Sequence, residues 1–410
     1  MTRWASEEER VSIRSVATAL PRHRVSAEET KRWLEIVSPG SSTDRLGRLV
    51  DRSAVRERAL LLPVDELLQC DSVEKRNQIY VREATALSEA VARRVLAEAR
   101  VRPEEITAVV SVSCTGYMIP SFDAHLIERL GLQNCTRRLP INALGCSAGV
   151  AALGAAYELL RGASSGAVLV ADVELCSLLL RTRDATRADT LGSILFADAA
   201  AAAVLTVGDH VRPRCSTLEV LASRSAFWRG ADIGLGMEMT NEGPRLVLSP
   251  RLPALVRSRL RETVEAFLGE NGLTLDDLRF HAVHPGGPRI LEAISAALTL
   301  PDRAVRPSWD VWERCGNLSS TTVFFVLEEL YRSAPPADGA LGLVYAPGPG
   351  PCCGATPAGS GSGSAPRSRT APSSTAPRTS RRWWATSASS GTTRTSRDAR
   401  SRTTASSARG

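Results

Sequence analysis

Short runs of consecutive apolar residues alternate with amphipathic segments along most of this chain of 410 residues. The runs at 108–113, 167–171 and 341–346 are rich in Val, Leu and Ala and predict strands buried on both faces. Between them, apolar residues recur at spacings of three and four, which predicts helices, for example over 122–130 and 255–268. This alternation is typical of an α/β fold whose mostly parallel strands are covered by helices.

The predicted elements occur twice in the same order. The strand at 108–113 and the helix at 122–130 correspond to a strand at 279–283 and a helix at 289–297. Each copy is followed by a turn of small residues, a further helix and an apolar strand. The sequence therefore predicts two similar βαβαβ halves that face each other, with ligands bound where loops enter helices.

This repeat sets the expected domain boundaries. The first half covers residues 1–210, the second covers 211–350, and residues 351–410 form a tail of different composition. After Val344 the chain has no Val, Ile, Leu, Met or Phe, and Ser, Thr, Ala, Arg, Pro and Gly dominate. Such a segment buries too little apolar surface to offset its ordering entropy, so we predict that the tail is disordered.

The net charge of +7 comes from the tail, which contains ten Arg, one Asp and no Lys or Glu. A basic balance confined to the tail does not indicate a nucleic-acid partner. No apolar run reaches the roughly 18 residues of a membrane span, and the charged start lacks the apolar region of a signal peptide. Nine cysteines without CxxC or zinc-ligand spacing favour a reducing, cytoplasmic location without a metal site.

Cys146 lies in a turn of small residues that opens the helix predicted over 151–160. Unpaired backbone N–H groups and the positive end of a helix dipole favour the thiolate form of such a cysteine. The sequence therefore predicts a nucleophile at this junction. Taken alone, such a cysteine more often has a buried structural role, packing the start of a helix.

His284 and Asn317 lie at comparable junctions in the second half. His284 is the one histidine of five that ends a predicted strand and enters a Gly-Gly loop, and Asn317 opens a helix. A Cys nucleophile with a His and an Asn as neutral hydrogen-bond donors suits acyl transfer and the stabilisation of a thioester enolate. Taken singly, His284 fits a structural imidazole, and Asn317 fits a helix N-cap.

Six segments spread over residues 10–350 resemble the signatures of the type III polyketide synthases, the chalcone synthase superfamily. They are RNQIY (76–80), CTGYMIP (114–120), LGCSAG (144–149), LFADA (195–199), HPGGPRIL (284–291) and GNLSS (316–320). The resemblance implies a bacterial member of this family, which is an acyltransferase. It also implies a thiolase-like fold in a five-layered α-β-α-β-α arrangement, a homodimer, and coenzyme A thioesters as substrates with no other cofactor.

The resemblance also implies roles for individual residues. Cys146 would take an acyl-CoA starter and the growing chain. His284 and Asn317 would orient malonyl-CoA for decarboxylative Claisen condensation. Phe196 matches the family's aromatic gatekeeper, and Ile119 lies on the loop that reaches into the partner's cavity.

A stripe of arginines matches the family's basic residues that face the phosphates of coenzyme A. Arg45, Arg48 and Arg52 share one face of a segment that could be helical over 43–60. A basic stripe suits a phosphate-bearing ligand, and it is also compatible with an ordinary solvated helix face.

Three cavity positions depart from the plant pattern. Leu246 stands where a second gatekeeper aromatic is expected, and Leu179 where other members have a small or polar residue. Cys114 replaces a Thr, as in bacterial naphthol-forming members. These features favour an alkylpyrone, alkylresorcinol or polyhydroxynaphthalene-type product over a chalcone.

The family's closing Gly-Phe-Gly-Pro-Gly-type loop and last apolar strand are replaced from Ala346 onwards. We hypothesise a reading-frame change at 346–355, which would leave a sheet edge unpaired, and sequencing of the locus tests this. Three alternatives remain at this point: a ketoacyl synthase of the same fold that acts on acyl carrier protein, a non-catalytic paralogue with a damaged C-terminus, and a papain-like protease. The β/α duplication opposes the protease.

Overall fold

The computed structural model describes residues 10–37, 42–181, 185–208, 218–228 and 234–348, together with the backbone of 352–360. The expected domain boundaries at 210/211 and 350/351 lie outside the described residues, as does the tail from residue 361 onwards.

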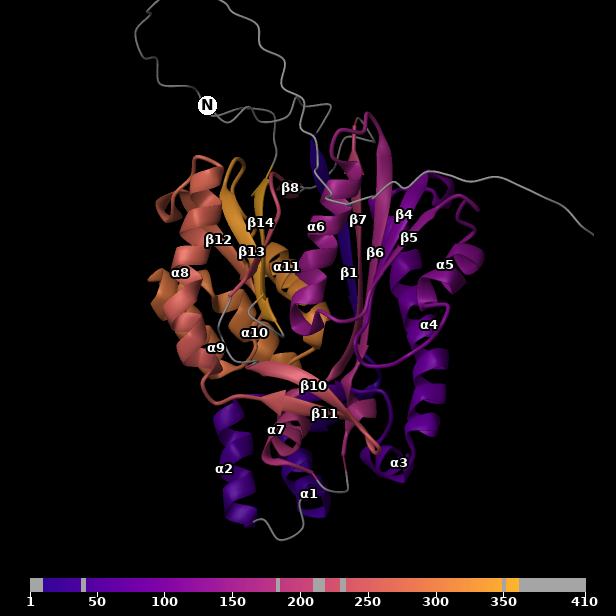
Figure 1. Cartoon of the computed structure of the whole chain (residues 1–410), viewed down its shortest axis with the longest axis vertical. Coiled ribbons are helices and arrows are strands. Elements are labelled where there is room, and N and C mark those ends of the chain that lie inside the picture. The colour runs from indigo at the N-terminus through magenta and orange to yellow at the C-terminus, as the bar shows by residue number, and fades with distance from the viewer. Residues whose placement is uncertain are drawn as a thin grey trace, which may run out of the picture. The chain divides into compact units, whose positions relative to one another are not determined.

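The first half is built on a sheet with helices on both faces. The strands lie in the order β1 (Val11–Ala19), β7 (Asp198–Val207), β6 (Gly166–Leu175), β4 (Ile106–Val112) and β5 (Arg137–Ile141). Helices α4 (Val73–Ala99) and α5 (Phe122–Leu130) cover one face, and α6 (Ala148–Leu160) covers the other (Figure 1).

The second half repeats this plan with fewer strands. Strands β12 (Leu278–Val283) and β13 (Leu341–Gly348) pair in parallel and continue into β14 (Cys352–Ser360). Helices α8 (Leu252–Glu270) and α9 (Pro288–Leu298) cover the outer face, and α11 (Thr322–Ser333) covers the inner face beside α6 (Figure 1). The layers thus run α-β-α-β-α as the sequence analysis predicts, with α6 and α11 in the middle.

The remaining elements are β2 (His23–Ser26), α1 (Ala27–Val37), α2 (Thr43–Ser53), β3 (Glu57–Leu60), α3 (Val64–Gln69), α7 (Arg187–Leu195), β8 (Leu218–Val220), β9 (Arg224–Phe227), β10 (Leu235–Thr240), β11 (Gly243–Leu248) and α10 (Arg306–Cys315). Of these elements, α1, α2, α3, α7, β10 and β11 lie at the lower end of the molecule in Figure 1, whereas β8 lies at the upper end. Strand β8 pairs with both β1 and β14 and so joins the two halves into one continuous sheet.

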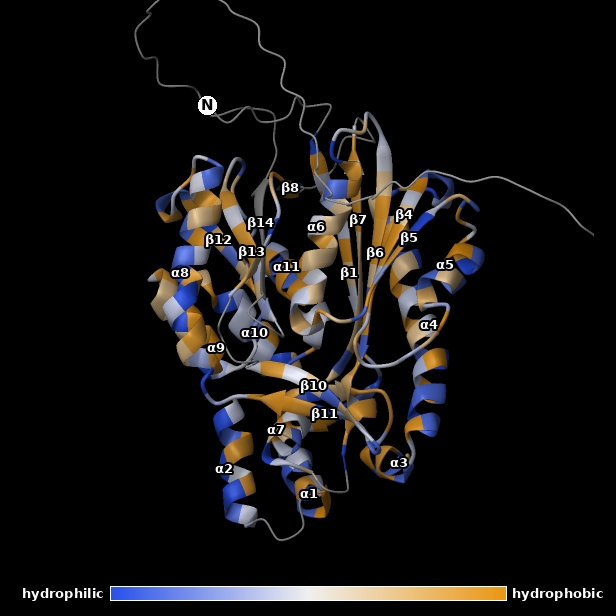
Figure 2. Ribbon diagram, viewed as in Figure 1, coloured by the Kyte–Doolittle hydropathy of each residue, from blue (hydrophilic) through white to orange (hydrophobic). Residues whose placement is uncertain are grey.

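Strand β7 shows how the sequence produces a doubly covered sheet. Successive residues of a strand point to opposite faces. Ala199, Ala201 and Ala203 pack in the core shared with α6 and α11, whereas Ala200 and Ala202 pack in the core under α4. Figure 2 shows hydrophobic residues along β7, β6 and β4. The small side chains let helices approach closely on both faces.

Two expectations about secondary structure are wrong. The sheet is mixed, because β7 pairs antiparallel with both β1 and β6, while β4–β5, β4–β6 and β12–β13 are the parallel pairs. The helix considered over 43–60 ends at Ser53, because Ala54 adopts a left-handed conformation with φ 58°, and the chain continues into β3.

The expectation that the second half lacks its last strand is also wrong. Strand β14 pairs antiparallel with β13 over eight residues and meets β8 and β9 on its other side. Backbone pairing needs no apolar side chains, which is why a segment of Cys, Gly, Ala, Thr, Pro and Ser still completes the edge. The tail is therefore not disordered from residue 351, since its first part forms a strand.

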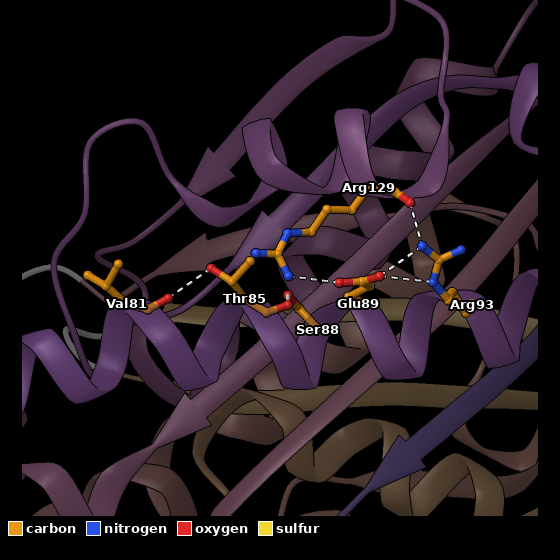
Figure 3. A network of polar contacts seen from close by, with 6 residues as sticks. All are labelled: Val81, Thr85, Ser88, Glu89, Arg93 and Arg129. Carbon is orange, nitrogen blue, oxygen red and sulfur yellow. Dashed lines mark hydrogen bonds and ion pairs between the residues drawn. The ribbon is translucent and has the colours of Figure 1, made fainter.

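Helices α4 and α5 are joined by a charged network on the outer face (Figure 3). Glu89 accepts from Arg93 at 2.8 Å within α4 and from Arg129 of α5 at 2.9 Å. Arg93 also donates to the backbone carbonyl of Arg129 at the end of α5, where a cation is favourable. Both arginines are about half exposed, so the network contributes at most about 1 kcal/mol per pair.

Within the described residues, no helix is long and apolar enough to cross a membrane.

We predict that the stability of the second half depends on β14. A chain ending at residue 350 loses all pairing of β13 with β14, so its melting temperature should fall by about 5 °C or more in a thermal-shift assay. A chain ending at residue 365 keeps β14 and should melt within about 1 °C of the full chain. Equal melting temperatures for the two truncations would contradict this role of β14.

Candidate active site

Cys146 lies in a 3-10 turn, Gly145–Ser147, that leads directly into α6. Gly145 adopts φ 50°, a left-handed conformation that glycine accepts without strain. The Ser147 hydroxyl donates to the Leu144 carbonyl at 2.8 Å and closes the turn. The Cys146 side chain is 6% exposed, and its thiol lies 4.0 Å from the Ser319 hydroxyl oxygen.

Asn317 lies at the equivalent junction of the second half, before a 3-10 turn that leads into α11. Its amide oxygen accepts from the Ser319 backbone N–H at 2.9 Å, which fixes the orientation of the amide. Asn317 is two residues before Ser319 in the sequence, and the Ser319 hydroxyl lies 4.0 Å from the Cys146 thiol. The structure brings these two junctions together, as the repeat predicts.

His284 directly follows β12, and its backbone N–H donates to the Tyr345 carbonyl of β13 at 3.0 Å. The side chain is 1% exposed, and neither ring nitrogen has a hydrogen-bond partner among the described residues. Burial lowers the pKa of His284 to about 4, so the resting imidazole is neutral. Strand β13, which pairs with β12, ends at Gly348 beside Ser147 of the Cys146 turn. His284 thus follows the strand next to the one that contacts this turn.

A cavity of about 320 Å³ opens next to Cys146. Five of the predicted site residues line it: Cys146, Cys114, Leu179, Phe196 and Leu246. Gly192 of α7 allows Leu246 to approach, since an added Cβ would lie 3.0 Å from its Cδ2. His284 and Asn317 are buried outside the lining of this cavity.

One part of the cavity wall is apolar. Trp33 of α1, Leu60 of β3, Val64 and Leu67 of α3, and Met237 of β10 contribute side chains to it. This part favours aliphatic groups because it offers them apolar contacts in place of water.

The Glu174 carboxylate of β6 accepts several hydrogen bonds from residues at the cavity wall and next to it. The Ser320 hydroxyl lies 2.7 Å from Oε1, and the Ser319 hydroxyl lies 3.3 Å from it. Cys114 donates to Glu174 through its backbone N–H at 3.1 Å and through its thiol at 3.3 Å. Glu174 is fully buried, so the network fixes Cys114 and Ser319 at the cavity wall.

The environment of Cys146 opposes the expected preference of a helix start for the thiolate form. Burial, and then the charge of Glu174, raise the pKa of Cys146 to about 12. The helix start favours the anion by only about 1 kcal/mol, which is less than the cost of placing a charge in this dry environment beside a carboxylate. The resting thiol is protonated and needs a base when it reacts.

Backbone contacts connect Arg58 of β3, the loop of Phe196 and the junction of Asn317. Its Nη1 donates to the carbonyls of Ser193 at 2.6 Å and Phe196 at 2.8 Å. Phe196 and Asn317 form an isolated backbone bridge, in which the Ala197 N–H donates to the Asn317 carbonyl at 2.9 Å. The loop that carries Phe196 is therefore fixed to the junction that carries Asn317.

Two predicted features lie on the surface. Arg45, Arg48 and Arg52 are exposed along α2 and are not part of the cavity wall. Ile119 is 79% exposed, next to Tyr117 at 69%. The structure does not bring these residues to the cavity of their own chain.

Several residues of the site were missed by the sequence analysis. Asp172 and Glu174 carried a usable signal, because two acids at alternate positions of an otherwise apolar strand must share one buried face. Arg58 carried none, since it lies in an ordinary charged segment and its partners are backbone carbonyls far along the chain. No cluster of residues that could hold a metal ion is found in the part of the chain that the structure describes.

Two family descriptions match this chain. Residues 2–209 match the N-terminal domain of the chalcone and stilbene synthases, and residues 219–353 match their C-terminal domain. The chain therefore belongs to the chalcone and stilbene synthase family. It is a type III polyketide synthase, an acyltransferase with the thiolase-like fold.

Its relatives include bacterial enzymes with different products. A 1,3,6,8-tetrahydroxynaphthalene synthase from Streptomyces peucetius is 34% identical over 343 residues, which are 83% of this chain and 91% of the relative. An alpha-pyrone synthesis polyketide synthase-like protein from Mycobacterium tuberculosis is 29% identical over 82% of this chain and 88% of the relative. The crystal structure of 1,3,6,8-tetrahydroxynaphthalene synthase from Streptomyces coelicolor superposes with a TM-score of 0.80 at 30% identity, over 86% of this chain and all of that chain.

We predict that Gly149→Ala pushes apart the start of α6, which follows Cys146, and the start of α11, which follows Asn317. An added Cβ on Gly149 of α6 would overlap the Ser320 backbone carbonyl, so the helix must move away from the turn before α11. We expect a loss of about 1–3 kcal/mol in the free energy of unfolding, measured by urea denaturation.

Gly47→Ala is the matched control, because nothing lies within 4 Å of an added Cβ on this residue of α2. It should stabilise the protein by about 0.5–1 kcal/mol, since alanine favours the helix. Similar unfolding free energies for the two variants would show that the contact between Gly149 and Ser320 does not limit the packing.

Proposed function

We propose that this enzyme loads an acyl-CoA starter on Cys146 and extends it with malonyl-CoA by decarboxylative Claisen condensation. The observation that carries the proposal is the buried Cys146 thiol at the wall of an apolar cavity, at a junction packed against the one that carries Asn317. In the loading step a bond forms between Cys146 Sγ and the acyl carbonyl carbon, and the bond to the coenzyme A sulfur breaks.

His284 is the base for loading. Its neutral imidazole accepts the thiol proton as the Cys146 sulfur attacks, and passes the proton to the leaving coenzyme A sulfur. The pKa values of about 12 and about 4 mean that the ion pair is not the resting state. Proton transfer is therefore concerted with attack.

In the extension step, the malonyl group loses carbon dioxide and leaves an enolate, whose carbon attacks the carbonyl carbon of the Cys146 thioester. A carbon–carbon bond forms, the bond to Cys146 Sγ breaks, and the lengthened chain remains on coenzyme A. The His284 N–H and the Asn317 amide donate to the enolate oxygen, and both are neutral groups held in a dry environment. The reaction needs no metal or organic cofactor, since coenzyme A enters as part of each substrate.

The cavity supports two product classes. Its apolar part suits an aliphatic starter and an alkylpyrone or alkylresorcinol. The Cys114 thiol at the cavity wall, with the similarity to tetrahydroxynaphthalene synthases, favours a polyhydroxynaphthalene made from malonyl-CoA alone. Mass spectrometry of products formed with malonyl-CoA alone, and with fatty acyl-CoA added, separates the two.

The reading-frame hypothesis, the cytoplasmic location and the absence of a nucleic-acid partner stay predictions. The family match ends at residue 353. The described cysteines, Cys70, Cys114, Cys135, Cys146, Cys176 and Cys315, are all free thiols.

We predict that Cys146→Ala abolishes polyketide formation, because the acyl thioester at this residue can no longer form. Product formation from malonyl-CoA, without acyl carrier protein, should fall at least about 1,000-fold by mass spectrometry. Cys176→Ala, which removes another cavity thiol, is the control and should retain condensation activity. Activity only with acyl carrier protein would favour the ketoacyl synthase alternative, and inactivity of the unmodified protein would favour the non-catalytic paralogue.

The arginine stripe of α2 gives a second prediction. Replacing Arg45, Arg48 and Arg52 together by Gln should raise KM for coenzyme A substrates about tenfold, because three charges near the phosphates are lost. The value of kcat should stay within about twofold. The exposed pair Arg257 and Arg259 of α8 is the control. An equal rise in KM when this pair is replaced would show that the stripe does not bind coenzyme A.

We also propose a homodimer formed at the free edge of β5. This strand ends the order of the described sheet, and Leu139 on it is 40% exposed. Leu139→Glu should convert a dimer to a monomer in sedimentation analysis. Ile36→Glu, a charge placed on an even more exposed residue of α1 (64% exposed), should leave the dimer intact.

A further inference from the structure

One hydroxyl group lies between two fully buried carboxyl groups beneath the active site. The Ser320 Oγ is 2.8 Å from Oδ1 of Asp172 and 2.7 Å from Oε1 of Glu174. Both acids are 0% exposed and lie on the same face of β6, two residues apart. Neither makes an ion pair with a Lys, Arg or His among the described residues.

A hydroxyl group has a single proton to donate, so it cannot satisfy two carboxylates at once. If both acids were ionised, one of the two short contacts would join an anion to a lone pair. Two like charges in a dry interior without a cation are strongly unfavourable. One of the two carboxyl groups must therefore hold a proton.

The hydrogen-bond partners decide which acid holds it. Glu174 accepts from the backbone N–H of Cys114 and receives the Cys114 thiol and the Ser319 hydroxyl as well as Ser320. Asp172 has only Ser320, and its Oδ2 has no partner in the described structure. Donors stabilise a carboxylate, so the charge belongs on Glu174 and the proton on Asp172.

We infer that Asp172 is a positioning residue that remains protonated, donates to Ser320 and thereby directs the Ser320 hydroxyl at Glu174. The hydrogen bonds then run in one direction, from Asp172 through Ser320 to Glu174. Glu174 is left as the single anion next to the Cys146 thiol. This consequence for Cys146 rests on the proposed function, whereas the location of the proton does not.

The other titratable groups around the pair are consistent with this assignment. Cys114, Cys146, Cys176 and Tyr80 face it from the neighbouring elements, and all are neutral at physiological pH. Burial, and then the charge of Glu174, raise the pKa of Asp172 well above its usual value. None of these groups supplies a positive charge.

Infrared spectroscopy tests the location of the proton without any need for turnover. The carbonyl band of a protonated carboxyl group should be present well above pH 6, where Asp198, with a pKa raised to about 6 by burial, has ionised. Asp172→Asn should remove that band and Glu174→Gln should keep it. No band in the unmodified protein, or a band lost only in Glu174→Gln, would overturn the inference.

The positioning role is tested through the reactivity of Cys146 toward iodoacetamide. Glu174→Gln should raise the alkylation rate at neutral pH about tenfold, equivalent to about one pKa unit. Asp172→Asn should leave the rate within about twofold, because the amide donates to Ser320 as the protonated acid does. Asp172→Ala, which cannot donate, should lower kcat about tenfold, and Asp172→Asn should restore it.

An alkylation rate that rises as much in Asp172→Asn as in Glu174→Gln would show that Asp172 is ionised. A kcat equally low in the alanine and asparagine variants would show that donation to Ser320 is not what Asp172 contributes. If the protein makes no product, the infrared and alkylation experiments still decide the inference, so its failure is distinguishable from failure of the proposed function.

Discussion

The close packing of Gly149 against the Ser320 carbonyl is the constraint on which the site depends. It brings the start of α6 and the start of α11 together in the middle layer, and these starts carry Cys146 and Asn317. Because a methyl group does not fit between Gly149 and Ser320, the geometry of the site is a direct result of how the halves pack.

Electrostatics then determines the reactivity of the site. Burial without an ion pair keeps His284 neutral and Cys146 protonated, and Glu174 strengthens the second effect. A site that stored a free thiolate would need a nearby cation, and under the proposed mechanism His284 becomes one only during reaction. Charge therefore develops only when substrate is bound, which suits an enzyme whose intermediates must be kept from water.

The sequence predicted the layered fold and the three catalytic candidates because both follow from local patterns and a repeat. The residues of β7 and α5 repeat with the period of a buried strand and of an amphipathic helix. Cys146, His284 and Asn317 each lie just before a helix, at positions that the repeat makes comparable. The mixed direction of the sheet could not be predicted, since an apolar strand such as β7 carries no signal for its direction. Strand β14 was missed because its pairing depends on backbone groups alone.

The site also had parts that local patterns do not encode. The contacts of Arg58 with Ser193 and Phe196 join residues 135 and 138 positions apart, and only the folded chain reveals them. The sequence shows the helix start that favours the Cys146 thiolate, but not the burial beside Glu174 that outweighs it. Thus the sequence indicates which residues can react, but it does not show how burial and neighbouring charges set their protonation states.

The most direct test of the central claim is capture of the acyl-enzyme. The protein is incubated with an acyl-CoA starter in the absence of malonyl-CoA, quenched in acid and digested, and its peptides are analysed by mass spectrometry. We predict that the acyl mass appears on the peptide that contains Cys146 and disappears in Cys146→Ala. An acyl group found on Cys114 or Cys176 instead, with Cys146 unmodified, would contradict the account.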